Sequence, residues 1–289
     1  MVMLSAVLMS AALLVLWRGL LWRGRSLPGV RRELPLLVGH RGVRGPLPEN
    51  GLRAFRMALD HGLDGVETDV QRTRDGVLVL VHDGEVDGVG VVEWRFRQLR
   101  ERVDDLTTLD ELLALVREYP GVWLNVELKT LALHDTGMAR AIVAALRANG
   151  LARAVARALR GSGLEDRTTV SSFDPLALAR LRLEAPTLRT AYLWSDEPNV
   201  PWPMRTPWPA GWLHVDALHP RWSSVDAELV AYGRRRALAV NAWTVNDPDE
   251  VRRLLALGVS GIMADDPAAL LRAAHAAAVS PGAGPEHAP

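Results

Sequence analysis

Short apolar, β-branched runs alternate with longer amphipathic stretches from Leu34 to about Ala277, and no other feature of the chain limits its fold as strongly. Strands that alternate with helices are typical of a parallel sheet covered by helices. About eight strands within about 240 residues fit a closed barrel better than an open sheet. We therefore predict an α/β fold, a (β/α)8 TIM barrel, over residues 35–278. Its strands are predicted at Leu36–Gly39, Gly65–Val70, Trp123–Leu128, Thr168–Ser172, Thr190–Leu193, Val215–Leu218, Ala239–Val245 and Gly261–Ala264.

One connection in this scheme is too short for a helix. Only six residues separate the second predicted strand from the next apolar run, and they include Asp75-Gly76, a dipeptide that favours tight turns. A two-residue hairpin loop at this dipeptide would bring Asp69 beside His82. We therefore predict a hairpin that sets an acid and a histidine next to each other, with a plain loop as the alternative.

The two ends of the chain depart from the alternating pattern. Residues 1–17 carry no charged side chain, and the apolar run resumes briefly before Arg23. About 20 helical residues cross a hydrocarbon core of about 30 Å, so residues 1–25 are predicted to be an uncleaved transmembrane anchor with Trp17 and Trp22 near the headgroups. A cleaved signal peptide is the alternative, although such peptides usually begin with basic residues. Residues 279–289 are rich in Pro, Gly and Ala and are predicted to be a disordered tail.

The basic residues around the predicted anchor indicate its orientation. Lys and Arg that flank a membrane span tend to stay on the cytoplasmic side. Here all of them follow the main apolar run, at Arg18, Arg23, Arg25, Arg31 and Arg32. The simple expectation is a single-pass membrane protein whose barrel lies on the cytoplasmic side.

The charge balance and the absence of cysteine exclude several kinds of site. Acidic and basic residues number 34 each, so nothing suggests nucleic acid as a partner. Without cysteine the chain can form neither disulfides nor thiolate metal sites. Nearly all basic residues are arginine, and Lys129 is the only lysine. A compact ammonium differs physically from a planar guanidinium, so this position favours a specific role over a chance survival.

Carboxylates gather at the ends of the predicted strands. Glu67 and Asp69 stand two residues apart on one strand and therefore share a face, and Glu127 and Lys129 do so on a later strand. In a barrel the carboxyl ends of the strands meet at one mouth, where active sites are built. Three inward carboxylates would repel one another unless protonated or bridged by a cation. Oxygen ligands suit Mg²⁺ or Ca²⁺, whereas a buried ion network with Arg41 and Lys129 is the purely structural alternative.

Two histidines flank the same carboxylates. His40 follows the first predicted strand and His82 ends the hairpin return. Imidazole exchanges protons near neutral pH, so one histidine can remove a proton from a nucleophile while the other protonates a leaving alkoxide. A cation and two positive side chains offset the charge of a phosphate diester. The predicted cation site, the two positive side chains and the two histidines together predict phosphodiester cleavage. His219, near the end of another strand, is interpreted as structural.

The motifs that carry these residues resemble those of the glycerophosphodiester phosphodiesterase family. The similarity covers nearly the whole chain after the predicted anchor and keeps the family's order. The segment Gly84–Gly90 departs from the usual pattern, and the compact region that follows it up to Leu106 lacks the larger insertion that covers the site in soluble members. Both differences leave the preferred head group open. The matching motifs are Gly39-His40-Arg41-Gly42, Pro48-Glu49-Asn50, Glu67-Thr68-Asp69-Val70, Asp75-Gly76, His82-Asp83, Leu106–Leu113, Asn125–Lys129, Ser171–Pro175, Trp243–Asp247 and Gly258–Pro267.

This resemblance implies a barrel hydrolase with a role for each matching residue. It places one divalent cation on Glu67, Asp69 and Glu127, and the two catalytic histidines at His40 and His82. It also implies that the substrate's own neighbouring hydroxyl attacks the phosphorus, giving a cyclic phosphate that water opens. The remaining positions are phosphate contacts at Arg41 and Lys129, an orienting or metal-proximal role for Glu49, and a pocket wall at Trp243.

Three functions are compatible with these residues. The first is hydrolysis of glycerophosphodiesters or lysophospholipids, releasing an alcohol and a glycerol phosphate or lysophosphatidic acid. The second is a phospholipase of the sphingomyelinase D type, which shares the acidic metal site and two histidines. The third is an inert, membrane-tethered module that only binds phosphodiesters, which loss of a site residue would favour. A tryptophan- and proline-rich stretch at 194–222 is expected to form a long irregular loop that either contacts lipid or packs on itself.

Overall fold

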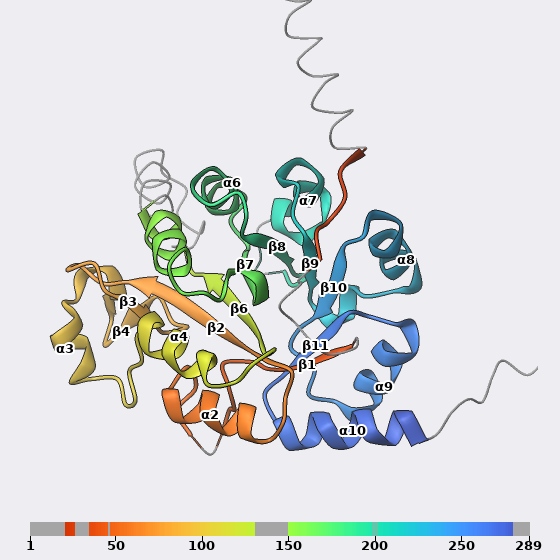
Figure 1. Ribbon diagram of the computed structural model, residues 1–289, viewed down its shortest axis with the longest axis horizontal. Helices are drawn as coiled ribbons and strands as arrows, with labels where there is room; N and C mark the ends of the chain where they lie inside the picture. Colours follow the sequence, from red (N-terminus) through yellow and green to blue (C-terminus); the bar gives the residue numbers. More distant parts are fainter. Residues whose placement is uncertain are drawn as a thin grey trace, which may run out of the picture.

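Eight parallel strands close into a barrel in the computed structural model, which describes residues 21–26, 35–45, 47–130, 150–198, 200 and 202–279. The strand order is β1-β11-β10-β9-β8-β7-β6-β2, and pairing of β1 with β2 closes the ring. The predicted TIM-barrel fold is therefore confirmed (Figure 1). The strands are β1 (Leu36–Gly39), β2 (Gly65–Arg72), β6 (Trp123–Leu128), β7 (Thr168–Ser172), β8 (Arg189–Trp194), β9 (Ala217–Pro220), β10 (Ala239–Ala242) and β11 (Gly261–Ala264).

Helices cover the outside of the strands, and several begin at a side-chain cap. Thr108, Asp174, Asp226 and Asp247 each accept a hydrogen bond from a backbone N–H of the first helical turn. The main apolar core lies between these helices and the outer faces of the strands. The helices are α2 (Leu52–Asp60), α3 (Phe96–Arg100), α4 (Leu109–Arg117), α6 (Pro175–Glu184), α7 (Trp208–Leu213), α8 (Ala227–Arg236), α9 (Pro248–Leu257) and α10 (Pro267–Val279), with residues 150–159 also helical.

The predicted hairpin after β2 is present, but its register differs by one residue. β3 (Leu78–Leu80) pairs antiparallel with β2, and the N–H of Val81 donates to the carbonyl of Asp69, so Val81 rather than His82 lies opposite Asp69. The turn explains the difference. The N–H of Thr73 donates to the carbonyl of Val77, which leaves a three-residue loop ending at Gly76 with φ of 92°. A type I turn followed by a left-handed glycine is a common alternative to the two-residue loop.

The barrel interior becomes polar toward the carboxyl ends of its strands. Along β6, Trp123, Asn125 and Glu127 share the inward face because strand side chains alternate. The indole N–H of Trp123 donates to the hydroxyl of Thr169, and the Asn125 amide donates to Ser171. An apolar floor of Leu36, Val38, Trp123 and Met263 thus lies beneath polar side chains that lead to the mouth.

His219 belongs to this interior rather than to the mouth. Its strand begins two residues later than predicted, which places His219 within β9, fully buried. Its Nε2 lies 2.9 Å from the Asn241 amide nitrogen, and its ring packs edge-on against Trp123. Burial lowers its pKa to about 3. This arrangement agrees with the structural role expected for His219.

Residues 21–26 pack against the barrel. Trp22 is only 8% exposed and stacks on the ring of His214, so it does not take the headgroup position expected for it. None of the helices within the described ranges combines the length and apolar character needed to cross a membrane. The anchor's predicted apolar run falls on residues 1–20, outside the described residues, and stays a prediction. The predicted tail, residues 279–289, is also outside them apart from Val279, which ends α10.

The tryptophan-rich stretch is more ordered than expected. After β8 it forms the short helix η3 (Trp202–Arg205) and then α7, which leads down to the amino end of β9. Trp194 is buried, whereas Trp208 and Trp212 on α7 are 55% and 57% exposed. The stretch therefore lies beside the barrel and combines packed with exposed tryptophans.

The buried neutral histidine predicts a pH dependence of stability. An unfolded chain binds a proton at His219 near pH 6.5, but the folded chain does so only near pH 3. The free energy of unfolding should therefore fall as the pH drops through this window, by up to about 1.4 kcal/mol per pH unit. Denaturant unfolding of His219→Gln between these pH values should show a shallower dependence than the unchanged protein. The exposed His275→Gln serves as control, and equal slopes in all three proteins would contradict the prediction.

Candidate active site at the barrel mouth

The site is assembled by three neighbouring strands. His40 and Arg41 directly follow β1, Glu67 and Asp69 lie on β2, and Glu127 lies on β6. β2 pairs with both neighbours, and Asp69 is the register partner of Glu127. Parallel pairing without a slip therefore sets these carboxylates side by side on the inward face.

The three carboxylates predicted to converge do so. Glu67, Asp69 and Glu127 are all buried, and each offers an oxygen within 4.8 Å of the others. At that separation two carboxylate charges repel by about 3 kcal/mol or more, with an effective dielectric constant of about 20. Burial, together with the charges of Asp69 and Glu127, raises the pKa of Glu67 well above its ordinary value. The cluster thus requires nearby positive charge to ionise fully.

Two cationic side chains supply part of that charge. The Nζ of Lys129 lies 2.7 Å from Glu127 and 3.1 Å from Asp69, and the Nε of Arg41 lies 3.0 Å from Asp69. Burial opposes ionisation of Asp69, but Lys129 and Arg41 outweigh it and hold the pKa of Asp69 below its ordinary value. Burial likewise opposes the charge on Lys129, yet Glu127 and Asp69 raise its pKa. The compact ammonium of Lys129 thus contacts both acids from just beyond the end of β6.

The loop after β1 holds these charges in place through Glu49 and Asn50. Glu49 accepts a 2.6 Å hydrogen bond from the Arg41 guanidinium, in line with the orienting role expected for it. The Asn50 amide donates to the Asp69 carboxylate, and its oxygen accepts from the Asp69 N–H and the Thr68 hydroxyl. Asn50 has φ of 60°, a left-handed conformation that asparagine tolerates better than most residues. Its role was not predicted, although its place in the Pro-Glu-Asn motif was a signal.

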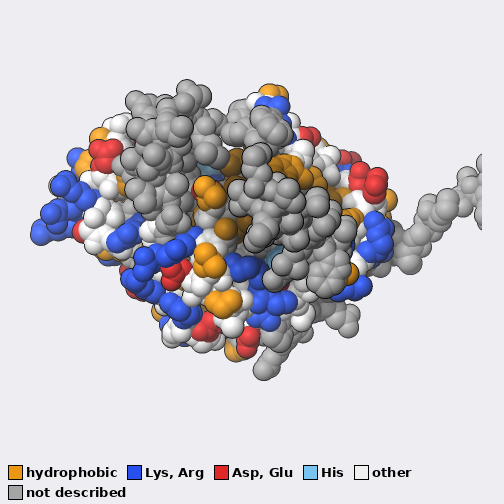
Figure 2. Space-filling model, turned by 90° about the horizontal axis from the view of Figure 1, so that it is seen from above, with side chains coloured by type: hydrophobic (Ala, Val, Ile, Leu, Met, Phe, Trp, Pro, Cys, Tyr) orange, Lys and Arg blue, Asp and Glu red, His pale blue; other side chains and the backbone are white. Residues whose placement is uncertain are grey.

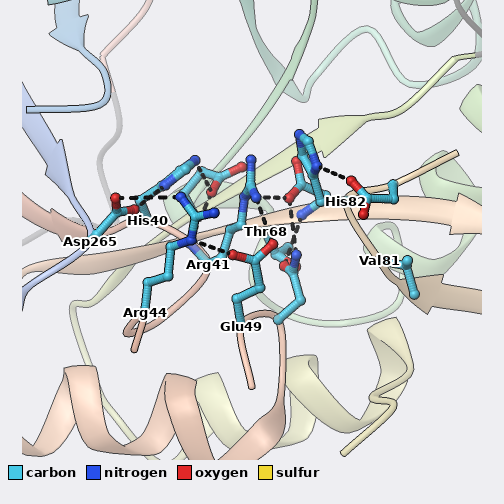
Figure 3. Close-up of polar contacts among 12 residues, drawn as sticks. His40, Arg41, Arg44, Glu49, Thr68, Val81, His82 and Asp265 are labelled. Carbon is cyan, nitrogen blue, oxygen red and sulfur yellow. Dashed lines mark hydrogen bonds and ion pairs between the residues drawn. The ribbon is translucent and has the colours of Figure 1, made fainter. Parts of the chain in front are cut away.

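The two histidines stand on either side of the Arg41 guanidinium, as Figure 3 shows. His40 is largely buried, with its Nε2 3.9 Å from Glu67, whereas the side chain of His82 is 38% exposed. Each ring has a carboxylate at Nδ1. Asp265 lies 2.7 Å from His40 and Asp83 lies 2.8 Å from His82. Both Nε2 atoms are therefore left for other partners.

Asp265 is a site residue that the sequence did not single out. Its carboxylate contacts His40 and also accepts from the Asn246 amide, while the Asn246 oxygen accepts from the Asp265 N–H. Burial opposes ionisation of Asp265, but the hydrogen bond and charge of His40 hold its pKa below the ordinary value. An ionised Asp265 accepts a hydrogen bond from the Nδ1–H of His40, which favours the tautomer whose unprotonated nitrogen is Nε2.

Trp243 follows β10 and stands beside this cluster. Its indole N–H donates to the carbonyl of His219, and its ring packs edge-on against Phe173 at 5.6 Å between centroids. The side chain remains partly exposed. A rigid aromatic wall of this kind fits the pocket role predicted for Trp243.

Comparison with known proteins now identifies the chain. Residues 40–269 match the model of the Glycerophosphoryl diester phosphodiesterase family, a span that contains every predicted site residue. The chain belongs to this family. A glycerophosphodiester phosphodiesterase of Caldanaerobacter subterraneus subsp. tengcongensis is 28% identical over 252 residues, covering 82% of this chain and 96% of that protein.

Solved structures of similar proteins agree with the family assignment. A Silicibacter pomeroyi protein described as a glycerophosphoryl diester phosphodiesterase superposes with a TM-score of 0.70 at 30% identity, over 87% of this chain and 94% of that one. An Oleispira antarctica phosphodiesterase, solved with the product sn-glycerol-3-phosphate, shares the fold with a TM-score of 0.65 at 24% identity, over 84% and 97%. This glycerophosphodiester phosphodiesterase family member is therefore a phosphoric diester hydrolase.

The donor set fits the divalent cation expected for the family. Three buried carboxylates present oxygen atoms close enough to share one ion, which suits Mg²⁺ or Ca²⁺. The buried Oδ1 of Asp69 lies 3.1 Å from the Nζ of Lys129, without the geometry of a hydrogen bond. Burial first, and then the charges of Asp69 and Glu127, raise the pKa of Glu67 despite the opposing charges of Arg41 and Lys129. The ion network that was the structural alternative is present, and the three carboxylates lie close enough together to hold a cation as well.

The contact between Asp265 and His40 predicts a measurable tautomer. In the unchanged protein, ¹⁵N NMR of the imidazole should show the proton of neutral His40 on Nδ1. Asp265→Asn should weaken this preference and lower kcat by about 10-fold or more, since general acid–base catalysis is worth about 10²–10⁴-fold. Asp266→Asn, which alters only the cap of α10, is the matched control. An unchanged tautomer in Asp265→Asn would contradict the assigned contact.

Proposed function

We propose that the protein hydrolyses a glycerophosphodiester or lysophospholipid by metal-dependent, two-histidine acid–base catalysis. The observation that carries the proposal is the buried trio of carboxylates at the barrel mouth with a histidine on each side. Glu67, Asp69 and Glu127 would hold one divalent cation, Mg²⁺ or Ca²⁺. When bound, the cation would offset negative charge on the phosphate oxygens.

The other side chains of the site would bind the phosphate and transfer protons. Arg41 and Lys129 reach the same carboxylates and would orient and stabilise the phosphate, with Arg41 held by Glu49. His40 and His82 would carry protons, one from the attacking hydroxyl and one to the leaving alkoxide. The attacking group would be the substrate's own neighbouring hydroxyl, and water would open the resulting cyclic phosphate. The products would be an alcohol and a glycerol phosphate or lysophosphatidic acid.

The competing functions differ in their products. A sphingomyelinase-D-like phospholipase would release choline from sphingomyelin, whereas the proposed enzyme would act on glycerol-containing diesters. An inert binding module would lack a site residue, and every predicted site residue is present. The retained site and the family membership favour an active enzyme.

A substrate and metal panel tests the proposal. The full chain in detergent should release glycerol phosphate or lysophosphatidic acid from the matching diesters with Mg²⁺ or Ca²⁺ and should be inactive in excess chelator. Glu67→Gln, Asp69→Asn and Glu127→Gln should each abolish turnover and weaken metal binding, because each removes an anionic ligand. Glu118→Gln, an exposed residue after α4, should retain activity. Full activity with chelator would refute metal dependence.

Replacing either histidine should lower activity without affecting folding. His40→Ala and His82→Ala should each lower kcat by about 10²-fold or more, the usual scale for losing a general acid or base, while thermal unfolding changes little. His61→Ala, at the exposed end of α2, is the matched control. A near-normal kcat in either variant would remove that histidine from the mechanism.

We also propose that residues 1–25 hold the enzyme to a membrane, with the barrel on the cytoplasmic side. The apolar run of residues 1–17 and the arginines that follow it support this placement. Protease added to intact cells should leave the barrel undigested and should degrade it only after lysis. Digestion in intact cells would show a reversed orientation or a cleaved signal.

A further inference from the structure

Residues 21–26 form a clip that fastens the start of the described chain to the barrel. Arg25 carries most of its polar contacts. Its Nε lies 2.8 Å from the Asp216 carboxylate, and its terminal nitrogens donate to the carbonyls of Pro186 and Leu188, each at 2.7 Å. The backbone N–H of Arg25 also donates to Asp216, whose side chain is 3% exposed. A charged group with this many partners fixes the segment closely.

The rest of the clip fits the barrel as tightly. The N–H of Gly24 donates to the carbonyl of Arg236, and a Cβ at Gly24 would lie 2.4 Å from the carbonyl oxygen of Ala237. Glycine is therefore required for this close approach. The Arg236 guanidinium donates to the carbonyl of Trp22, and Trp22 is buried against His214.

Among the described residues, the polar partners of the clip lie at one end of the barrel. Its partners at 186–188, 214–216 and 236–238 immediately precede the strands β8, β9 and β10. They therefore belong to the amino-end face. The carboxylates and histidines lie toward or beyond the carboxyl ends of β1, β2 and β6. The clip and the active-site mouth are thus at opposite ends of the barrel.

Exposed apolar side chains continue from the clip onto the neighbouring helix. Leu21 is 59% exposed, and Trp208 and Trp212 on α7 are 55% and 57% exposed. α7 ends next to His214, on which Trp22 stacks, and Figure 1 shows it beside the start of the described chain. Figure 2, a view from above, shows hydrophobic side chains near the middle among charged side chains of both signs. Exposed tryptophans are typical of a membrane interface.

We propose that a lipid surface covers Leu21, Trp208 and Trp212, so that the barrel's amino-end face is held near the bilayer and the mouth opens toward water. Residues 1–20 directly precede Leu21 in the sequence, so the apolar run is joined to the barrel through the clip. The test must also distinguish a lipid surface from a second copy of the chain as the partner that covers these three side chains.

This orientation selects a substrate class, an inference that rests on the proposed phosphodiesterase activity. A mouth turned away from the bilayer reaches dissolved diesters but not headgroups in the membrane that holds the enzyme. The substrates are therefore water-soluble glycerophosphodiesters rather than membrane-embedded lysophospholipids. Of the glycerophosphodiesters and lysophospholipids named for the proposed function, the clip therefore favours the glycerophosphodiesters.

Fluorescent labels can measure the orientation because the chain contains no native cysteine. Leu183→Cys, at the amino-end side on α6 and 77% exposed, and Glu85→Cys, exposed in β4 (Glu85–Val86) near His82, provide two probes. Each full-length variant would be labelled and reconstituted, one chain per phosphatidylcholine nanodisc, with quencher-labelled headgroups. Quenching should be strong at position 183 and weak at position 85. Equal or reversed quenching, or protein that stays off the discs, would overturn the proposal.

Activity in the same discs tests the substrate class. Dissolved glycerophosphocholine should be hydrolysed, and lysophosphatidylcholine within the disc should not be. Arg25→Ala should reduce the quenching difference by loosening the clip, whereas Arg23→Ala, an exposed arginine, is the control with equal charge change. Preferential hydrolysis of the embedded lipid would overturn the orientation while upholding the phosphodiesterase. Loss of both activities with normal quenching would refute the proposed function alone. If the protein bound the discs only as a complex of two chains, the apolar face would be assigned to contact with a second copy.

Discussion

Mutual repulsion of three buried carboxylates is the constraint on which the barrel mouth depends. Glu67, Asp69 and Glu127 are held too close to ionise together without nearby positive charge. Arg41 and Lys129 are placed against them for this reason, and Glu49 and Asn50 in turn hold Arg41 and Asp69. A divalent cation held by the three carboxylates would add further positive charge to this balance. With that cation bound, the two cationic side chains and the ion together would outweigh the three carboxylates and could receive the phosphate of a diester.

The barrel makes this arrangement possible because its strands fix direction and register. β2 lies between β1 and β6, so a loop after β1 and the inward faces of two strands meet at one point. The apolar floor around Trp123 and the neutral His219 fill the lumen below, where no charge is needed. The N-terminal clip occupies the far end through Arg25 and Asp216. The carboxylate cluster and the N-terminal clip thus lie at opposite ends of the barrel.

Much of this was predictable from sequence because the signals are local. Four strands, including Leu36–Gly39, have the predicted bounds, since buried parallel strands read as short β-branched apolar runs. The two-residue spacing of Glu67 and Asp69 fixed their common face. The hairpin register was wrong by one residue because Asp75-Gly76 suits both two- and three-residue loops, and only the packed structure selects between them. Asp265 was missed because its contact with His40 spans 225 residues, and Trp22 was misplaced because an interfacial and a packed tryptophan look alike in sequence.

Crystals grown with Mn²⁺ as an anomalous scatterer would test the central claim most directly. The account predicts one anomalous peak at the mouth, bound by oxygen atoms of Glu67, Asp69 and Glu127 at about 2.0–2.6 Å, as hard cations bind carboxylates. The peak should vanish in Glu127→Gln crystals grown in the same solution, while the barrel is unchanged. A preparation that Mn²⁺ activates but whose crystals hold the ion elsewhere, or hold none, would contradict the assignment of these carboxylates as the metal site.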